Sequence, residues 1–245
     1  MKAVLLGATK GIGRALAQEM AARGARLCLL GRNLQALEKS AKDLQIRGAE
    51  GAVTTVLCDL MDRESFDRAL ESADVALEGF DTVVVTAGVF AAQDALEADL
   101  ERASDLLMTN FTNTVLFCEL VRKRLLERGG GTLCVFSSVA GDRGRKPAVL
   151  YGATKAGISH YMEGLDHRYH EEGLSAVLVK PGFVKTSMTA GLNVPPFAAE
   201  PASVARTVLD AINKGKPVVY VPGVWFLVML VIRWLPRFVM RRVGF

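Results

Sequence analysis

The stretch Lys2-Ala3-Val4-Leu5-Leu6-Gly7-Ala8-Thr9-Lys10-Gly11-Ile12-Gly13 decides the fold class of this chain. A short apolar run enters a glycine-rich turn, and a helical pattern that includes Leu16 and Met20 follows it. A strand, a glycine turn and a helix in this order set a pyrophosphate on backbone N–H groups at the helix N-terminus. Such turns also occur as plain connections, but the position directly after the first strand favours dinucleotide binding.

Apolar runs continue along the 245 residues and alternate with helical patterns. Their length and β-branched content indicate buried parallel strands at 26–30, 52–58, 81–85, 131–136, 174–180 and 217–221. Half of the residues are hydrophobic, which is enough for a sizeable core. We therefore predict one α/β domain over 1–222, a doubly wound Rossmann fold whose seven-stranded, mainly parallel sheet carries helices on both faces.

A second motif, Tyr151-Gly152-Ala153-Thr154-Lys155, places a phenol and an ammonium four residues apart. On a helix these positions share one face, so Lys155 can stand beside Tyr151. A nearby cation favours the phenolate and lowers a tyrosine pKa from its usual value of about 10. Ser138, thirteen residues upstream, can hold a carbonyl or alcohol oxygen. The set predicts proton transfer to an oxygen during a hydride transfer, although Tyr and Lys at this spacing also decorate ordinary helices.

These stretches resemble the short-chain dehydrogenase/reductase family over residues 2 to 221. The glycine pattern of the family is matched by Gly7, Gly11 and Gly13, and its catalytic set by Asn110, Ser138, Tyr151 and Lys155. The resemblance implies that Tyr151 is the general acid in reduction. It implies that Lys155 lowers the pKa of Tyr151 and bonds the nicotinamide ribose. By the same resemblance, Ser138 orients the carbonyl and Asn110 holds a water in a proton relay.

The resemblance also implies a cofactor site. Its residues are Gly7, Thr9, Lys10, Gly11, Ile12, Gly13, Arg32, Asn33, Asp59, Leu60, Ala87, Gly88, Asn110, Tyr151, Lys155, Pro181, Gly182, Val184 and Thr186. Two positions depart from the family pattern. Leu6 stands where Thr is usual, and Val85-Thr86-Ala87-Gly88 replaces Asn-Asn-Ala-Gly. Both are supporting positions, so the departures concern cofactor affinity or the branch of the family.

The charge pattern favours NADPH over NAD. NAD-preferring enzymes offer a carboxylate at the end of the second strand to bond the ribose 2′-hydroxyl. Here the strand ends Leu29-Leu30-Gly31-Arg32-Asn33, with no acid, and Lys10 lies in the glycine turn. Two cations and no anion suit a 2′-phosphate. Arg32 could also be an ordinary solvated residue at a helix start.

The C-terminal tail, residues 223–245, is apolar and basic. Every acidic residue lies at or before Asp210, and six cations follow, so the rest of a chain of net charge +4 carries −2. Arg233 interrupts the apolar run too soon for a span of about 20 residues. Arginines at 233, 237 and 241 predict one basic stripe on a helix that lies in the interface of an anionic membrane. The alternative is a tail that packs into a subunit interface or over the substrate cleft.

Two segments bear on the substrate. The loop Gly141-Asp142-Arg143-Gly144-Arg145-Lys146-Pro147 follows the catalytic serine, and Arg143 and Arg145 could meet an anionic group such as a phosphate. A solvated basic loop is an equal alternative. Residues 187–203 form a predicted lid, in which Met188 and Leu192 indicate an apolar substrate.

The loop, the tyrosine motif and the tail are most similar to decaprenylphosphoryl-2-keto-pentose reductases, and the tail is also similar to that of 3-ketosphinganine reductases. The resemblance implies reduction of a ketone on a lipid or lipid-linked substrate at the cytoplasmic face of a membrane. Three alternatives stay open: a soluble 3-oxoacyl-carrier-protein reductase, a steroid or xenobiotic carbonyl reductase, and a non-catalytic NADP-sensing interaction protein.

Cysteine and histidine usage indicates no metal site. The four cysteines fall in apolar patterns without a C-x-x-C pair, which indicates core packing in a reducing compartment. Three histidines share one predicted helix, and we expect them at a surface or an interface. No secretory signal peptide is expected, because the first strand begins at residue 2. No nucleic-acid partner is expected. By resemblance, helices 101–127 and 149–172 form the interface of a homodimer or homotetramer.

Overall fold

A computed structural model describes residues 1–191 and 193–243, and its centre is a seven-stranded sheet. The strand order is β3-β2-β1-β4-β5-β6-β7, and every pair is parallel. The strands are β1 (Lys2–Leu6), β2 (Arg26–Gly31), β3 (Thr54–Leu57), β4 (Thr82–Val85), β5 (Gly131–Phe136), β6 (Leu174–Pro181) and β7 (Val218–Val221). The predicted doubly wound Rossmann fold is therefore confirmed, and the sheet is wholly rather than mainly parallel.

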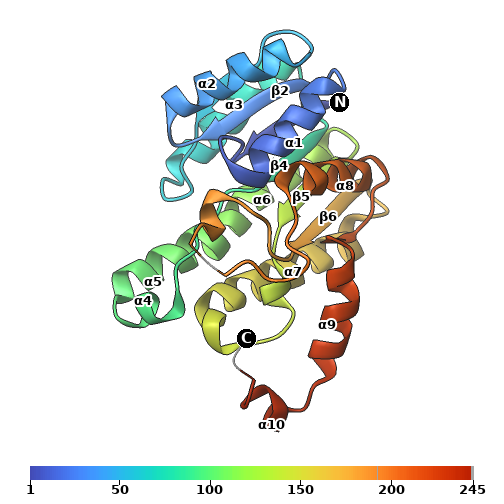
Figure 1. The fold of residues 1–245 in the computed structure, drawn as a ribbon. Helices are drawn as coiled ribbons and strands as arrows, with labels where there is room; N and C mark the ends of the chain where they lie inside the picture. The colour runs from blue at the N-terminus through green and yellow to red at the C-terminus, as the bar shows by residue number, and fades with distance from the viewer. Residues whose placement is uncertain (192, 244–245) are drawn as a thin grey trace.

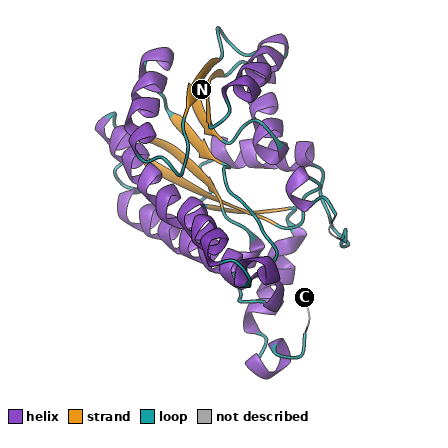
Figure 2. Cartoon of the chain, turned by 90° about the vertical axis from the view of Figure 1, so that its left-hand side faces the viewer, coloured by secondary structure: helices purple, strands orange, loops and turns teal. Residues whose placement is uncertain are grey.

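Helices cover both faces of the sheet, so the molecule has three layers (Figures 1 and 2). The helices are α1 (Gly11–Ala22), α2 (Leu34–Ile46), α3 (Glu64–Leu77), α4 (Gln93–Glu97), α5 (Leu100–Leu107), α6 (Asn113–Glu127), α7 (Val149–Tyr169), α8 (Pro201–Asn213), α9 (Val224–Trp234) and α10 (Arg237–Met240). A π-helical segment, Met108–Thr112, joins α5 to α6.

Alternation along the strands explains the two cores. Successive strand residues point to opposite faces. Ala3 and Leu5 of β1 therefore belong to the core under α1, α2 and α8, and Val4 and Leu6 belong to the core under α3, α6 and α7. Both cores are apolar because a parallel sheet is buried on both faces. The four cysteines are buried within them as free thiols, as predicted.

All seven strands run in the same direction, so their carboxyl ends lie at one edge of the sheet. The order reverses between β1 and β4, where the crossovers leave the sheet on opposite faces. Ligands of doubly wound folds bind in the crevice at that point. The topology thus directs the glycine turn after β1 and the segments after β4, β5 and β6 to one edge.

The C-terminal tail has a defined place that its sequence did not indicate. Helix α9 continues from β7 and extends away from the sheet (Figure 1). Met229 and Ile232 are buried on one side of α9, against Val139 of the loop after β5. One side of α9 therefore packs onto the chain's own fold.

The predicted basic stripe on one helix is wrong. Helix α9 ends at Trp234, because Leu235 is extended before Pro236, and α10 starts anew at Arg237. A residue before proline is driven out of the helical region by a clash with the proline ring. Arg233 therefore lies on a different helix from Arg237. Within residues 1–191 and 193–243, no helix combines the length and the apolar character needed to cross a membrane.

Candidate active site

The glycine turn after β1 packs against the segment after β4 so closely that side chains are excluded. A Cβ on Gly7 would come within 2.5 Å of the backbone nitrogen of Ala87, and Gly7 has a φ of +99°. A Cβ on Gly13 would collide with the carbonyl oxygen of Gly7 and the hydroxyl of Thr86. Glycine is required where φ is positive or the backbone approaches this closely. The predicted turn is therefore present, and α1 begins at Gly11.

Thr86, at a position where the sequence departs from the family pattern, supports that turn. Its hydroxyl lies 3.2 Å from the carbonyl oxygen of Leu6 and 3.0 Å from that of Gly7, so it can donate to either. The backbone N–H groups of Thr86 and Ala87 also donate to the carbonyl of Leu6. A threonine at position 86 therefore ties β4 to the glycine turn through its own hydrogen bonds.

A cavity of about 560 Å³ lies between the glycine turn and the segment after β6. Thr9, Lys10 and Gly11 line one side, and Lys185, Thr186 and Ser187 line the other. The start of α1, the hydroxyls and the Lys10 ammonium suit a pyrophosphate, whereas Lys185 is paired with Glu200 of the same lining. The methyl group of Thr186 would lie 3.3 Å from a Cβ on Gly11, so the two segments meet across this space. The residues present therefore fit a dinucleotide.

The proposed adenosine end has mixed support. Arg32 is exposed, as is Lys10, and both are free of ion pairs to described residues. Asn33, which was predicted to contact the cofactor, caps α2 by accepting a hydrogen bond from the N–H of Ala36 at 2.9 Å. Its side-chain oxygen is thus engaged in the fold. Leu60 follows Asp59 after β3 and is held by Asn113, whose amide donates to its carbonyl.

Asn110 lies in the π-helical segment and is 1 % exposed. Its side-chain oxygen accepts from the N–H of Val89 at 2.8 Å, and its amide donates to the carbonyl of Val89 at 2.7 Å. A Cβ on Gly88 would lie 3.1 Å from the Asn110 oxygen and 3.7 Å from the Lys155 ammonium. The structure thus brings the segment after β4, Asn110 and Lys155 together.

Ser138 and Tyr151 face each other from the end of β5 and the first turn of α7. Ser138 caps the short turn Val139–Gly141, and its hydroxyl accepts from Ala140 at 3.1 Å. The same hydroxyl lies 3.5 Å from the carbonyl of Pro181 and is near enough to Tyr151 to lower the pKa of its phenol. The four residues predicted from the sequence therefore converge at the carboxyl edge of the sheet.

Burial governs the pKa values of the proton-transfer groups. It raises the pKa of Tyr151 to about 12, and only the nearby hydroxyl of Ser138 acts in the opposite direction. Burial lowers the pKa of Lys155 to about 8. The Lys155 ammonium donates to the carbonyl of Phe136 at 2.9 Å and lies 5.7 Å from the centre of the Tyr151 ring. Lys155 is not among the groups that shift the Tyr151 pKa in these side chains alone, so the expectation that it lowers this pKa is not met, and desolvation of the phenol prevails.

Phe90 is a neighbour of Tyr151 that sequence reasoning missed. Its ring packs edge-on against Tyr151, with 5.2 Å between ring centres. It follows Ala87-Gly88-Val89, and its place after the glycine of that motif was the only available signal. The contact holds the phenol on one side while Ser138 approaches from another.

Comparison with known proteins agrees with this geometry. Residues 1–195 match the short chain dehydrogenase family. An uncharacterised oxidoreductase of Streptomyces coelicolor is 36% identical over 240 residues, covering 98% of this chain and 94% of the relative. One of Mycobacterium tuberculosis is 33% identical over 239 residues, covering 98% and 95%. The chain belongs to the short-chain dehydrogenase/reductase family.

Solved structures share the fold of this short-chain dehydrogenase/reductase. A crystal structure of an actinorhodin polyketide ketoreductase with NADPH has a TM-score of 0.81 at 24% identity, covering 90% of this chain and 95% of that one. A short chain dehydrogenase/reductase family protein has a TM-score of 0.76 at 28% identity, covering 90% and 97%. The protein is thus an oxidoreductase of this family, whose members use a nicotinamide cofactor and act on small molecules.

The arrangement can protonate the oxygen of a carbonyl group whose carbon gains a hydride. A bound nicotinamide cofactor supplies or accepts the hydride. A phenol whose pKa lies near 12 is protonated at neutral pH, so Tyr151 holds a proton to donate. The hydroxyl of Ser138 stands beside it to bond the same substrate oxygen. Buried Lys155 can bond a ribose from the other side.

The loop that follows Ser138 is joined to α9. Arg143 donates to the carbonyl of Leu235 at 2.9 Å, so it holds the end of α9. The Nε atom of Arg145 is buried without a partner in the described part of the chain, and burial lowers the pKa of its guanidinium. Met188 is half exposed, at 45 %. Leu192 lies outside the described residues.

Asp142 is the centre of a buried polar cluster that sequence reasoning missed. The ammonium of Lys180 on β6 lies 2.6 Å from Oδ1 of Asp142, and the hydroxyl of Tyr220 on β7 donates to Oδ2 at 2.7 Å. The Asp142 carboxylate is 2 % exposed. The cluster fixes the loop that carries Ser138 to the ends of two strands.

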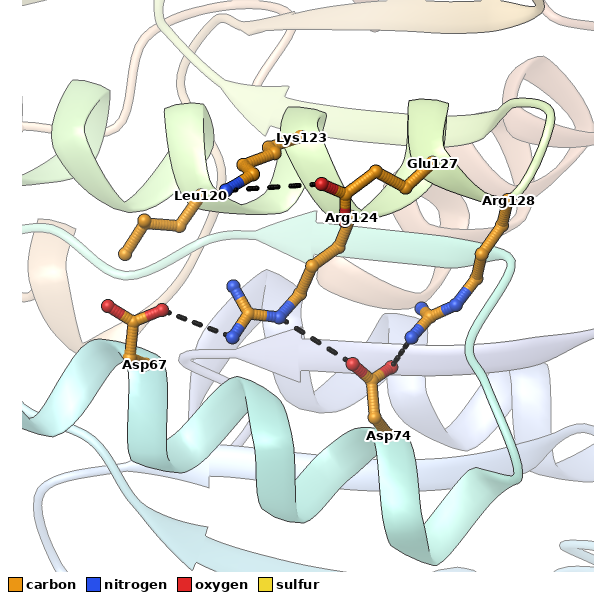
Figure 3. A pocket seen from close by; sticks show the side chains of 7 residues that line it. All are labelled: Asp67, Asp74, Leu120, Lys123, Arg124, Glu127 and Arg128. Carbon is orange, nitrogen blue, oxygen red and sulfur yellow. Dashed lines mark hydrogen bonds and ion pairs between the residues drawn. The ribbon is translucent and has the colours of Figure 1, made fainter.

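A second cavity, of about 370 Å³, lies between α3 and α6 and serves the fold (Figure 3). Arg124 pairs with Asp67 at 3.1 Å and with Asp74 at 3.6 Å, and Arg128 pairs with Asp74 at 2.7 Å. Lys123 and Glu127 form an ion pair beside them, so their charges cancel. Because its cations and carboxylates pair together, this cavity has no surplus charge to select an ionic ligand.

Proposed function

We propose that this oxidoreductase uses NADPH to reduce a ketone to a secondary alcohol on a lipid or lipid-linked substrate. The observation that carries the reaction is the convergence of Ser138, Tyr151 and Lys155 beside the glycine turn. Tyr151 donates the proton and Ser138 orients the carbonyl. Asn110 holds a water that links Lys155 to solvent.

NADPH is favoured because Arg32, after β2, and Lys10, in the glycine turn, are exposed cations that a 2′-phosphate could meet. The NADPH of the polyketide ketoreductase with the same fold supports the choice. The cofactor contacts named from the sequence, including Val184 and Thr186, complete the site in this proposal.

The lipid substrate is supported by the outer side of α9. Met229 and Ile232 face the core, whereas Leu227, Val231 and Trp234 are 62 %, 64 % and 82 % exposed. They recur at helical spacing and form one apolar stripe, which we call the outer stripe. Basic residues follow the outer stripe in the sequence, and their positive charge fits an anionic membrane surface. We infer a peripheral position on the cytoplasmic face, where the substrate is a polyprenylphosphoryl keto sugar or a long-chain keto base.

The oligomer is inferred from family resemblance and is a homodimer or homotetramer through α6 and α7. Leu116 on α6 is 41 % exposed and is available for such a contact. Light scattering of the purified protein measures the assembly directly, and a monomer would contradict this part of the proposal.

Replacing Tyr151 by Phe tests the reaction. We expect turnover of the ketone to fall by about 10²- to 10⁴-fold, the usual contribution of a general acid, while the dissociation constant of NADPH stays the same. Tyr169→Phe, at the end of the same helix, is the control and retains activity. Stopped-flow oxidation of NADPH measures the turnover of both variants. Lipid-linked keto sugars, long-chain keto bases and soluble ketones are compared as substrates.

The outcomes separate the alternatives. Retained turnover in Tyr151→Phe would rule out this mechanism. If the protein binds NADPH but does not oxidise it in the presence of any of these ketones, the nucleotide-sensing alternative is supported. Preference for soluble ketones over lipid-linked ones would favour a soluble carbonyl reductase.

A further inference from the structure

Gln93, at the start of α4, is a buried polar residue outside the family's motifs, and it is 8 % exposed. Its side-chain oxygen accepts from the backbone N–H of Val149 at 2.9 Å and from that of Leu150 at 3.1 Å. These two residues open α7, and Tyr151 follows them in the same turn. A side chain from a distant segment thus holds the turn that carries the phenol of Tyr151.

The start of α7 needs an acceptor from elsewhere in the chain. The residue before α7 is Ala148, whose methyl group cannot accept a hydrogen bond. The first N–H groups of a helix have no partner within the helix, and a polar side chain just before the helix normally satisfies one of them. Gln93, 56 positions before Val149, takes that role for two of these groups.

Glu97, one turn further along α4, fixes the orientation of the Gln93 amide. The amide nitrogen donates to the Glu97 carboxylate at 2.8 Å, so the amide oxygen is turned toward α7. An amide has one donor end and one acceptor end, whereas an ionised carboxylate can only accept. Glu97 therefore determines which end of the Gln93 side chain meets the helix.

The segment that holds α7 also touches Tyr151 directly. Phe90 packs edge-on against the Tyr151 ring, with 5.2 Å between the ring centres. The neighbouring Val89 is fixed by both hydrogen bonds of the Asn110 side chain. Residues 89–97 thus meet both the phenol and the backbone that carries it, and Asn110 anchors the segment on which both contacts depend.

We propose that Gln93 is a positioning residue for proton transfer: by bonding the first two N–H groups of α7, it fixes the phenol of Tyr151 relative to Ser138. This inference rests on the proposed reduction, in which Tyr151 donates the proton. Gln93 acts through the backbone and not on the substrate. A misplacement of about 1 Å can cost roughly 10²-fold in rate, so a residue that fixes a position can govern kcat without taking part in the chemistry.

Gln93→Met keeps a side chain of similar size and removes the acceptor. With the fastest ketone of the panel used for Tyr151→Phe, we expect kcat to fall about 10- to 100-fold. KM and the dissociation constant of NADPH should stay the same. Gln45→Met, the same change at an exposed position of α2, is the control and retains kcat.

A charge-neutral exchange gives the matched rescue. The double variant Gln93→Glu with Glu97→Gln reverses the donor and the acceptor of the pair. Position 93 again accepts from both N–H groups of α7, and position 97 donates to it. We therefore expect the double variant to recover most of the kcat that Gln93→Met loses.

The chain contains four tyrosines, which makes the phenol itself observable. Tyrosine labelled with ¹³C at Cζ gives one signal per residue, and Tyr151→Phe assigns the signal of Tyr151 in the full chain with NADP⁺. We expect this signal to move in Gln93→Met and to return in the double variant, while the other three signals stay in place. Should Gln93→Met fail to fold, Glu97→Ala removes only the partner that orients the amide and should produce the same changes at a smaller size.

The outcomes distinguish this inference from the reaction on which it rests. A stationary Tyr151 signal in Gln93→Met, or an unchanged kcat, would overturn the proposal and leave the reduction standing. Movement of all four tyrosine signals, or a loss of kcat that the double variant does not recover, would assign Gln93 a general role in the fold and also overturn it. If the wild type reduces none of the ketones, the reduction is rejected, and a displaced Tyr151 signal would still support placement of the phenol by Gln93.

Discussion

Lys155 carries the largest electrostatic cost of the active site, because its ammonium is buried without a carboxylate partner. Its hydrogen bond to the carbonyl of Phe136 does not offset desolvation, and its pKa falls from 10.5 to about 8. An apolar residue would fill the same space at a lower desolvation cost, so we infer that the buried ammonium of Lys155 has a function in the site.

The pKa shift of Lys155 predicts a pH-dependent stability. Between pH 8 and 10.5 the unfolded chain binds the lysine proton and the folded chain does not, so this group raises the free energy of unfolding as pH rises. The full effect is about 3 kcal/mol. In Lys155→Met this contribution is absent. Urea unfolding at pH 7.5 and 9.5 should therefore show a smaller pH-dependent gain in the variant than in the wild type, and equal gains would contradict the shift.

The proposed preference for NADPH predicts that Arg32 governs the choice of cofactor. Arg32→Asp removes a cation from the 2′-phosphate and offers a carboxylate to a 2′-hydroxyl, so the NADPH dissociation constant should rise about 10- to 100-fold while that of NADH falls. Fluorescence titration measures both constants. Arg102→Asp, an exposed arginine on α5, is the control for net charge. Unchanged preference in Arg32→Asp would exclude a 2′-phosphate contact.

At the scale of elements, the loop after β5 depends on a buried ion pair. Lys180–Asp142 and Lys185–Glu200 have nearly equal N–O distances, 2.6 and 2.7 Å, but the first pair is buried and the second is exposed. A buried carboxylate that loses its partner is costly, whereas an exposed pair contributes little.

We expect Lys180→Met to lower the free energy of unfolding by about 3 kcal/mol and Lys185→Met by less than about 1 kcal/mol. Lys180→Met should also lower kcat/KM, because Asp142 fixes the loop that carries Ser138. Chemical denaturation and steady-state kinetics check the two effects. Similar losses in both variants would mean that burial of the Lys180 pair does not matter.

At the scale of the whole molecule, charge and apolar surface are concentrated at the C-terminal end. Six cations and no carboxylates follow Asp210 in the sequence that contains the outer stripe, and the rest of the chain is net negative. This asymmetry would orient the protein on an anionic surface, with α9 between that surface and the catalytic loop.

Flotation with vesicles tests this orientation. The full chain should float with anionic vesicles, less with neutral ones, and less again in about 1 M salt, where charges are screened beyond about 3 Å. Val231→Ser combined with Trp234→Ser should reduce binding by about tenfold or more through lost apolar contact. Val75→Ser, an exposed valine on α3, is the control. Equal flotation of all three proteins would exclude the outer stripe as a membrane contact.

The positions of the hydrophobic runs that form the strands, the glycine turn and the candidate site residues Ser138, Tyr151 and Lys155 could all be predicted from the sequence. These are predictable because periodicity and short motifs depend on local backbone geometry. The sequence did not reveal Thr86 as the tie to the glycine turn, Phe90 beside Tyr151, or the Asp142 cluster. Each is a contact between segments far apart in the chain, which no spacing rule encodes.

Only the tertiary structure decided the place of the tail and the balance of charge in the active site. The apolar run of 224–234 has hydrophobic residues on all sides, so its sequence could not tell that Met229 and Ile232 face the core while Val231 faces outward. The tyrosine and lysine spacing predicted a lowered Tyr151 pKa, but the depth of burial raised it. Burial is a property of the assembled fold, and desolvation grows with it, so only the folded chain shows which effect prevails.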